Sequence, residues 1–347
     1  MPAGAWAQSV AFINPGKSDE IYWATATQAM QAAARSLGQT LEVFYAEREH
    51  LRVFAFAREL VARPPEQRPE YVVFSNDYGT APELLRIFDG SGIKVFMAFS
   101  RPQGEAEQLV GRPRERFKDW IGSLEPRAQD AGYLTAKALI EKGRAQGLRA
   151  PDGKLHLLVI AGDRSTTSSI LRNEGMQRAV REARDVLIAQ EVYASWTREK
   201  AAEQAAWLWQ RHPDARLVWA GNDLMAFGAM QALEARGGEP GKTALFSGIN
   251  TSREAMRALM SGRLAALAGG HFINGAWAMV MIHDHHRGID FRAEGLTQER
   301  PMFALFNERT AAQFVARFDE QLGQLDFRRY SKAQNPRLKR YDFGFEQ

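Results

Sequence analysis

The stretch VWAGNDLMAFGAMQAL, residues 218–233, places an amide and a carboxylate side by side where one apolar run ends and another begins. Asn and Asp side chains cap helices, because their oxygens accept hydrogen bonds from backbone N–H groups of the first turn. A cap needs only one residue of the pair Asn222-Asp223, so the other is left for a different partner. The carboxyl end of a strand that feeds a helix is also where open parallel sheets collect ligand groups.

Other polar and aromatic side chains stand at comparable junctions along the chain. Amides and guanidinium groups can satisfy hydroxyl groups, and aromatic faces can stack on the apolar faces of a sugar ring. The residues near the ends of the predicted strands therefore form a candidate sugar-binding set. The set comprises Lys17, Asp19, Tyr22, Trp23, Asn76, Asp77, Arg172, Trp196, Asn222, Asn250 and His271.

Two series of alternating elements must position these residues. The runs of the first series are continuously apolar, which is typical of parallel strands covered on both faces. The strands are predicted at 9–14, 41–46, 71–76 and 93–100, with helices at 19–37, 51–63 and 81–88. Residues 101–122 are rich in Pro, Gly and charge, and predict a surface excursion that ends in a strand leaving the first lobe.

The same rhythm resumes in the second half of the chain. The strands are predicted at 155–161, 187–193, 217–219 and 244–249, and the helices at 129–142, 168–183, 199–211 and 224–235. The pattern indicates an α/β protein with two doubly wound Rossmann-like lobes, joined by three crossings, with a ligand cleft between them.

The length of 347 residues accommodates two lobes of ordinary size. We expect an N-terminal lobe from residues 8–122 plus 272–302 and a C-terminal lobe from 123–271 plus 303–330. The remaining residues, 331–347, are expected to form a C-terminal tail that packs on the lobes.

Composition excludes several classes of protein. The 45 basic and 41 acidic residues are interleaved, whereas a nucleic-acid binder concentrates its basic residues on one face or arm. The chain has no cysteine, which rules out disulfides and Cys-based metal sites. Its longest apolar run, near Phe272–Ile282, is shorter than the ~18 residues of a membrane span. We therefore expect no nucleic-acid partner and no transmembrane helix.

Two further motifs invite other interpretations. GGEPGKT, residues 237–243, lacks the glycine that a phosphate-binding loop needs at Arg236 and follows a helix, so a helix-terminating turn is expected. HDHH, residues 283–286, places only His283 and His286 on one helical face, so a solvated or interlobe helix end is favoured over a metal site. No nucleophile or zinc-protease motif is present. We expect no enzymatic activity, no cofactor and no metal.

The longer patterns resemble those of type I periplasmic solute-binding proteins. WAGNDLMAFGAMQAL resembles the family segment NDxMAxGAxxAL, and RNEGMQRAV, residues 172–180, resembles its RxxGFxxA element. SGINTSREAMRAL and GGHFINGAWAMVMI stand where the family has a GxD segment and a strand that returns to the first lobe. The resemblance covers most of residues 9–300 and implies capture of a small polar ligand by closure of two lobes.

The resemblance also implies roles for individual residues. Tyr22, Trp23 and Trp196 fall where sugar binders have stacking aromatic rings. Asn76 falls at the amide that follows the third strand, and Arg172 at the arginine that clamps ring oxygens.

At the opening junction, the resemblance implies that Asn222 points into the cleft while Asp223 caps the helix. The sequence departs from the family pattern at Asn250, which replaces the usual Asp, and at His271, which stands near a usual Gln or Asn. The loss of a carboxylate weakens the case for a plain aldopyranose. A negatively charged ligand would pair more easily with the cationic members of the set.

A periplasmic location follows from the same resemblance. Ala5-Trp6-Ala7 followed by Gln8 fits a signal-peptidase site, so we expect export with cleavage near Gln8. The expected ligand is carbohydrate-like, the protein is expected to be a monomer, and its partner would be an ABC permease or a sensor histidine kinase of the inner membrane. The alternative is a LacI-like regulatory domain, which would carry a DNA-binding module of about 60 residues before the first strand. An enzyme is a third and less favoured class.

Overall fold

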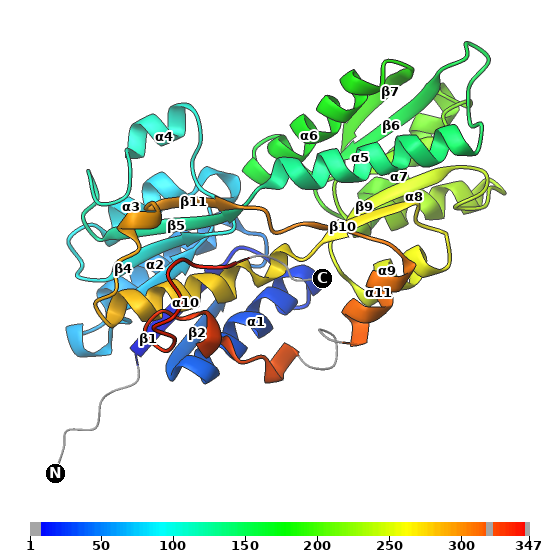
Figure 1. The fold of residues 1–347 in the computed structure, drawn as a ribbon. Helices are drawn as coiled ribbons and strands as arrows, with labels where there is room; N and C mark the ends of the chain where they lie inside the picture. Colours follow the sequence, from blue (N-terminus) through cyan, green and yellow to red (C-terminus); the bar gives the residue numbers. More distant parts are fainter. Residues whose placement is uncertain (1–7, 317–321, 344–347) are drawn as a thin grey trace. The chain divides into compact units, whose positions relative to one another are not determined.

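A computed structural model describes residues 8–316 and 322–343 of the chain. It contains two compact α/β units, each built on one six-stranded sheet with helices on its faces (Figure 1). The two doubly wound α/β lobes predicted from the sequence are thereby confirmed. The first unit comprises residues 8–126, 272–302 and 322–343, and the second comprises 127–271 and 303–316.

The first unit has a fully parallel sheet with the strand order β11-β5-β4-β3-β1-β2. The strands are β1 (Gln8–Asn14), β2 (Gln39–Tyr45), β3 (Tyr71–Phe74), β4 (Lys94–Ala98), β5 (Trp120–Pro126) and β11 (Thr297–Arg300). The helices are α1 (Ile21–Leu37), α2 (His50–Ala62), α3 (Ala81–Phe88), α4 (Glu105–Val110) and α10 (Asn274–His286). Ala11 and Ile13 of β1 pack in one apolar cluster with α2 and α3. Side chains two residues apart in a strand lie on the same face of the sheet, so this face is the one that α2 and α3 cover.

The second unit has the strand order β12-β10-β9-β8-β6-β7, in which only β12 runs antiparallel to its neighbour. The strands are β6 (Leu155–Ala161), β7 (Val186–Tyr193), β8 (Leu217–Ala220), β9 (Leu245–Ile249), β10 (Ala266–Gly269) and β12 (Ala304–Phe306). The helices are α5 (Ala128–Ala145), α6 (Thr167–Ala183), α7 (Arg198–Arg211), α8 (Asp223–Ala235), α9 (Arg253–Met260) and α11 (Glu308–Phe314). As expected for GGEPGKT, α8 ends at Ala235 and a turn with Gly237 at φ 82° follows.

The predicted boundaries of the lobes need two corrections. β5 pairs along its whole length with strands of the first sheet, so the first unit extends to Pro126 rather than to residue 122. Residues 322–330, predicted to belong to the C-terminal lobe, pack on the first unit instead. Arg35 of α1 donates to the Gly323 carbonyl at 3.2 Å, and the Phe327 and Tyr330 rings pack edge-on against Trp277. This contact buries apolar rings, which explains why the segment returns to the first unit.

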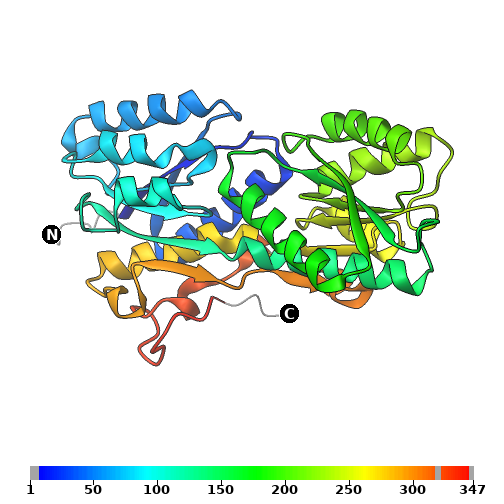
Figure 2. The same cartoon turned by 90° about the horizontal axis from the view of Figure 1, so that it is seen from above.

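The tail packs along α10 in both views of the chain (Figures 1 and 2). The Asp284 carboxylate is fully buried and accepts hydrogen bonds from Ser331 Oγ, from two tail backbone N–H groups and from Tyr341 Oη at 2.9 Å. His283 is buried as well, and burial lowers its pKa. The prediction of a solvated or interlobe end for HDHH is therefore wrong at His283 and Asp284, because the tail covers this turn of the helix.

The expected cleavage site before Gln8 lies outside the described residues. Within residues 8–316 and 322–343, the helices are all too short or too polar to cross a bilayer.

Candidate functional site

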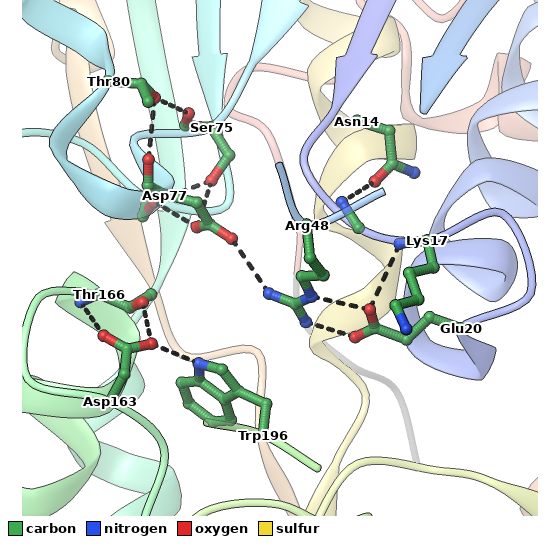
Figure 3. A network of polar contacts seen from close by, with 12 residues as sticks. Asn14, Lys17, Glu20, Arg48, Ser75, Asp77, Thr80, Asp163, Thr166 and Trp196 are labelled. Atoms are coloured by element: carbon green, nitrogen blue, oxygen red, sulfur yellow. Dashed lines mark hydrogen bonds and ion pairs between the residues drawn. The ribbon is translucent and has the colours of Figure 1, made fainter. Parts of the chain in front are cut away.

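The loops that follow four neighbouring strands of the first sheet share one polar network (Figure 3). Because the strands are parallel, their carboxyl ends meet at one edge of the sheet. We call this set of side chains the first half-site. It consists of Glu20 after β1, Arg48 after β2, Ser75 and Asp77 after β3, and Ser100 after β4.

Arg48 connects the two ends of this network. Its Nε donates to Glu20 Oε2 at 2.9 Å and its Nη2 donates to the second Glu20 oxygen, while Nη1 lies 3.9 Å from Asp77 Oδ2. Burial alone would lower the pKa of Arg48, but the Glu20 carboxylate raises it well above its usual value. The backbone at Arg48 has a φ of 64°, a left-handed conformation that few non-glycine residues adopt. Arg48 is therefore a fixed cation at the edge of the sheet.

Asp77 is held from its other side. Its Oδ1 accepts from Ser75 Oγ at 3.0 Å, and Ser75 Oγ lies 2.8 Å from Ser100 Oγ. Thr80 Oγ1 donates to the Asp77 backbone carbonyl at 2.9 Å. These contacts orient the Asp77 carboxylate by hydrogen bonds that originate on two adjacent strands.

The residues of the first unit that the sequence indicated lie near this network but differ in environment. Lys17 and Asp19 are exposed, Tyr22 is half-buried, and Trp23 is only 4 % exposed. The Trp23 ring packs on the backbone of Gly16, where a Cβ atom would lie 2.0 Å from Trp23 Cδ1. Only a glycine at residue 16 permits this contact, so the turn after β1 sets the position of the ring.

Asn76 has a structural partner of its own. Its Oδ1 accepts from the backbone N–H of Ala81 at 3.0 Å, in the first turn of α3. The buried amide therefore orders the start of the helix that follows β3, with Asp77 next to it.

A second half-site lies at the carboxyl ends of the second sheet. We define it by Asp163 after β6, Trp196 after β7, the pair Asn222-Asp223 after β8, Asn250 after β9 and His271 after β10, together with Arg172 of α6. All of the predicted residues of the second unit belong to this set.

Arg172 is buried and hydrogen-bonded within the second unit. Its Nη1 donates to the Gly221 carbonyl at 2.8 Å, and its Nη2 lies 3.0 Å from His271 Nε2. Burial, together with the neighbouring guanidinium charge, lowers the pKa of His271 well below its usual value. His271 is therefore neutral near pH 7, and its Nε2 accepts the hydrogen bond from Arg172.

Trp196 presents a face to the same arginine. The Arg172 guanidinium carbon lies 5.5 Å from the centroid of the Trp196 ring and 5.9 Å from that of Phe303. The Trp196 indole N–H donates to Asp163 Oδ2 at 2.6 Å (Figure 3). A cation held between aromatic faces keeps a fixed orientation, and the indole is itself fixed through its N–H.

Asp163 accepts hydrogen bonds from the loop after β6 as well as from the Trp196 indole. It accepts from the backbone N–H of Thr166 at 2.6 Å and of Ser165 at 2.8 Å, and also from Thr166 Oγ1. Burial alone would raise its pKa, but these hydrogen bonds hold the pKa of Asp163 below its ordinary value. Asp163 is therefore ionised near pH 7 and suited to orient the Trp196 ring.

In the pair Asn222-Asp223, the cap of α8 comes from Asn222 and not from Asp223, to which the resemblance assigned it. Asn222 caps α8, because its Oδ1 accepts from the Met225 N–H at 2.8 Å. Asp223 is buried and accepts from Asn250 Nδ2 at 3.0 Å and from Ser252 Oγ. Burial raises the pKa of Asp223. The Asp223 side chain therefore connects the loop after β8 to the loop after β9. The sequence does not indicate these contacts, because Asn250 and Ser252 lie 27 and 29 residues from Asp223.

Sequence reasoning missed several functional candidates, among them Glu20, Arg48, Asp163 and Phe303. Arg48 and Asp163 each follow a predicted strand, so their positions carried the same signal as the residues that were selected. Glu20 and Phe303 carried none, because their roles depend on partners 28 residues or more away. Within the described parts of the chain, no three His, Asp or Glu residues form a group suited to a metal ion.

The geometry predicts that Asp163 controls the indole of Trp196. Asp163→Ala should remove the N–H acceptor and shift the tryptophan emission, whereas Asp163→Asn should restore part of the wild-type spectrum because its amide oxygen still accepts. The measurement is steady-state fluorescence of the protein without ligand. In a Trp196→Phe background, Asp163→Ala should leave the emission unchanged, and a shift that persists there would contradict the assignment.

Comparison with known proteins adds a family to this geometry. Residues 10–288 match the family model described as "Periplasmic binding protein domain". The crystal structure of a periplasmic sugar-binding protein from Pseudomonas fluorescens is 38 % identical, with a TM-score of 0.87 over 97 % of this chain and 98 % of that one.

Two further relatives are more distant or match over a shorter segment. The D-allose-binding periplasmic protein of Escherichia coli K12 is 31 % identical over 135 residues, which cover 39 % of this chain and only 40 % of that relative's length. An ABC transporter periplasmic solute-binding protein from Actinobacillus succinogenes 130z, solved with bound D-allose, is 18 % identical with a TM-score of 0.74, covering 88 % of this chain and 99 % of that one. At 18 % identity, the last comparison concerns the fold alone.

Proposed function

The chain belongs to the periplasmic binding protein domain family, and on that premise we propose that it captures a small carbohydrate in the periplasm for an ABC importer. Three kinds of relative support this ligand and partner. They are the periplasmic sugar-binding protein, the D-allose-binding protein, and the ABC transporter solute-binding protein with bound D-allose.

The observation that carries the proposal is the pair of half-sites. Each unit gathers fixed hydrogen-bonding groups at the carboxyl ends of parallel strands, the position where α/β sheets bind ligands. Fixed donors and acceptors suit the hydroxyl groups of a sugar. The members of the predicted set in both units, from Lys17 to His271, are proposed to provide or support these contacts.

We propose that one carbohydrate molecule contacts both half-sites, so that binding favours a conformation in which the units approach each other. A ligand shifts a conformational equilibrium only by its difference in affinity for the two states. A change from mostly open to mostly closed requires about 5 kcal/mol of that difference, which two or three charge-assisted hydrogen bonds supply. The closed state would then be the form that the importer recognises.

Arg172 provides the test of this function. We expect at least one neutral sugar or polyol among D-allose, L-arabinose and myo-inositol to bind in isothermal titration calorimetry. Arg172→Lys should weaken that binding at least about tenfold, because an ammonium cannot donate to Gly221 and His271 and also to a ligand in the planar geometry of the guanidinium.

The matched control is Arg178→Lys on the same helix. Arg178 is exposed and pairs with Glu182 at 3.0 Å, so its substitution should leave the affinity within about twofold. Equal affinity of the Arg172→Lys variant and the wild type would remove Arg172 from the binding site. Failure of all three compounds to bind would argue against a neutral sugar as the ligand.

A further inference from the structure

The first half-site contains a donor and an acceptor at an unusual separation. Arg48 Nη1 and Asp77 Oδ2 lie 3.9 Å apart. This distance exceeds the roughly 2.7–3.2 Å of a direct N–H···O hydrogen bond. A single oxygen atom could hydrogen-bond to both groups, because two bonds of about 2.8 Å would meet at that atom at an angle of roughly 90°.

The Arg48 guanidinium and the Asp77 carboxylate are both held in place by other contacts, and these contacts set the distance between them. The Arg48 guanidinium is bound through two of its nitrogens to Glu20, and its backbone has a φ of 64°. The Asp77 carboxylate is bound through its other oxygen to Ser75 Oγ. Each side chain is thus held by contacts on the side away from the other (Figure 3).

A donor and an acceptor at this spacing recognise a particular kind of oxygen. A hydroxyl oxygen can accept from Arg48 Nη1 and at the same time donate its hydrogen to Asp77 Oδ2. A carboxylate oxygen only accepts, so it would meet the Asp77 carboxylate with like charge, and an ammonium group only donates. The pair is therefore selective for groups that are both donor and acceptor.

We propose that Arg48 and Asp77 together bind one hydroxyl group of the captured molecule and make the first unit selective for neutral polyols over anionic sugars. This inference rests on the proposed carbohydrate-binding function and specifies its ligand class. It assigns Arg48, which the sequence analysis did not select, as a specificity-determining residue.

The charges around the pair act in the same direction. The ionised forms of Glu20, Arg48 and Asp77 carry two negative charges and one positive charge, so the cluster as a whole repels an anion. Lys17 is exposed, and solvent and salt screen its charge. The cationic environment that the sequence suggested for a negatively charged ligand is thus offset in the first unit by two carboxylates.

The experiment compares neutral and anionic probes on three variants. The probes are D-allose, L-arabinose, myo-inositol, D-glucuronate and inorganic phosphate, measured by calorimetry at pH 7. Wild-type protein should bind one of the neutral compounds, and should bind D-glucuronate and phosphate at least about tenfold more weakly. Asp77→Asn and Arg48→Lys should each weaken the neutral compound at least about tenfold. Asp77→Asn should also reduce the ratio of the affinity for the neutral compound to the affinity for D-glucuronate. The substitution removes the negative charge of Asp77, which repels the D-glucuronate carboxylate.

Arg63→Lys is the matched control. Arg63 makes a two-nitrogen contact with Glu42 at 2.8 and 2.9 Å beyond the other end of α2, so it reproduces the arginine–glutamate pair away from the half-site. Its substitution should leave every affinity within about twofold. Asp77→Asn keeps the size of the side chain and an acceptor for Ser75, so it remains informative if Arg48→Lys does not fold.

Monodeoxy derivatives of the bound neutral compound identify the hydroxyl. One derivative should bind to wild-type protein as weakly as the parent compound binds to the Asp77→Asn variant. The Asp77→Asn variant should bind this derivative and the parent compound with equal affinity. If a neutral compound binds but both variants match the wild type, or if D-glucuronate binds more tightly, the hydroxyl assignment is wrong and the proposed function stands. If none of the carbohydrates binds, both are overturned.

Discussion

Asp284→Asn is expected to lower the free energy of unfolding by about 3 kcal/mol or more and to release the tail from α10. The wild-type carboxylate is fully buried and accepts four hydrogen bonds from the tail, including those from Ser331 and Tyr341. Hydrogen bonds to a charged group contribute roughly 1.5–3 kcal/mol each, and the asparagine would direct an N–H group at donors. Loss of the hydrogen bonds between Asp284 and the tail should also expose Trp277, which packs against Phe327, Tyr330 and Phe343.

Denaturant unfolding followed by fluorescence measures the stability, and limited proteolysis reports release of the tail. Asp326→Asn is the control, because Asp326 lies in the same segment, is exposed, and pairs with Arg328 two residues away. Its effect should stay within about 0.5 kcal/mol. Equal stability and equal protease resistance of the Asp284→Asn variant and the wild type would show that the tail is held by its aromatic contacts alone.

Gly132→Ala is expected to destabilise the second unit by about 3 kcal/mol or more and to weaken ligand binding. A Cβ atom at residue 132 would lie 1.8 Å from the backbone carbonyl oxygen of Arg172, and one at Gly175 would lie 2.0 Å from that of Gln129. The backbones of α5 and α6 are therefore in contact, and added volume there must separate the helices. Because α6 carries Arg172, the separation moves the guanidinium away from Gly221 and His271.

Gly143→Ala on the same helix is the matched control. The atoms nearest to its Cβ would belong to the Leu217 side chain, the closest at 3.0 Å, and alanine is favoured in helices by about 1 kcal/mol over glycine. We expect a change in stability below about 1 kcal/mol and unchanged affinity. Thermal unfolding and calorimetry with the best neutral sugar make both comparisons. A Gly132→Ala variant as stable as Gly143→Ala would mean that α5 and α6 do not pack backbone to backbone.

The architecture was predictable because its signals are local. Continuous apolar runs such as 71–74 and 157–161 mark buried parallel strands, and helical periodicity between them predicts the doubly wound order. The strand ends then indicate where polar groups gather, which located Asn76, Trp196 and His271 without knowledge of their contacts. These residues do stand at the carboxyl ends of their sheets.

The hydrogen-bond partners were less predictable, because each depends on residues distant in the sequence. Asn222 and Asp223 are equally good caps, and the choice between them follows from Asn250 and Ser252, which hold the Asp223 carboxylate from another loop. Arg48 lies 28 residues from Glu20, and nothing between them signals the pair.

The prediction of an exposed helix end at HDHH was wrong for a similar reason. HDHH is polar in composition, and a polar helix end is usually exposed. The donors that satisfy Asp284 lie 47–57 residues further along the chain, in a segment without helical or strand periodicity. Burial of this aspartate could be inferred only from the three-dimensional structure.

We propose that one carbohydrate molecule contacts both units and draws them together. Small-angle X-ray scattering tests it most directly, with the neutral sugar or polyol that calorimetry identifies added at saturation. We expect the radius of gyration to fall on addition of that compound, and the Arg172→Lys variant to require a correspondingly higher concentration for the same change. A radius of gyration that stays constant while calorimetry shows full occupancy would contradict the account, because the ligand would then be held by one unit alone.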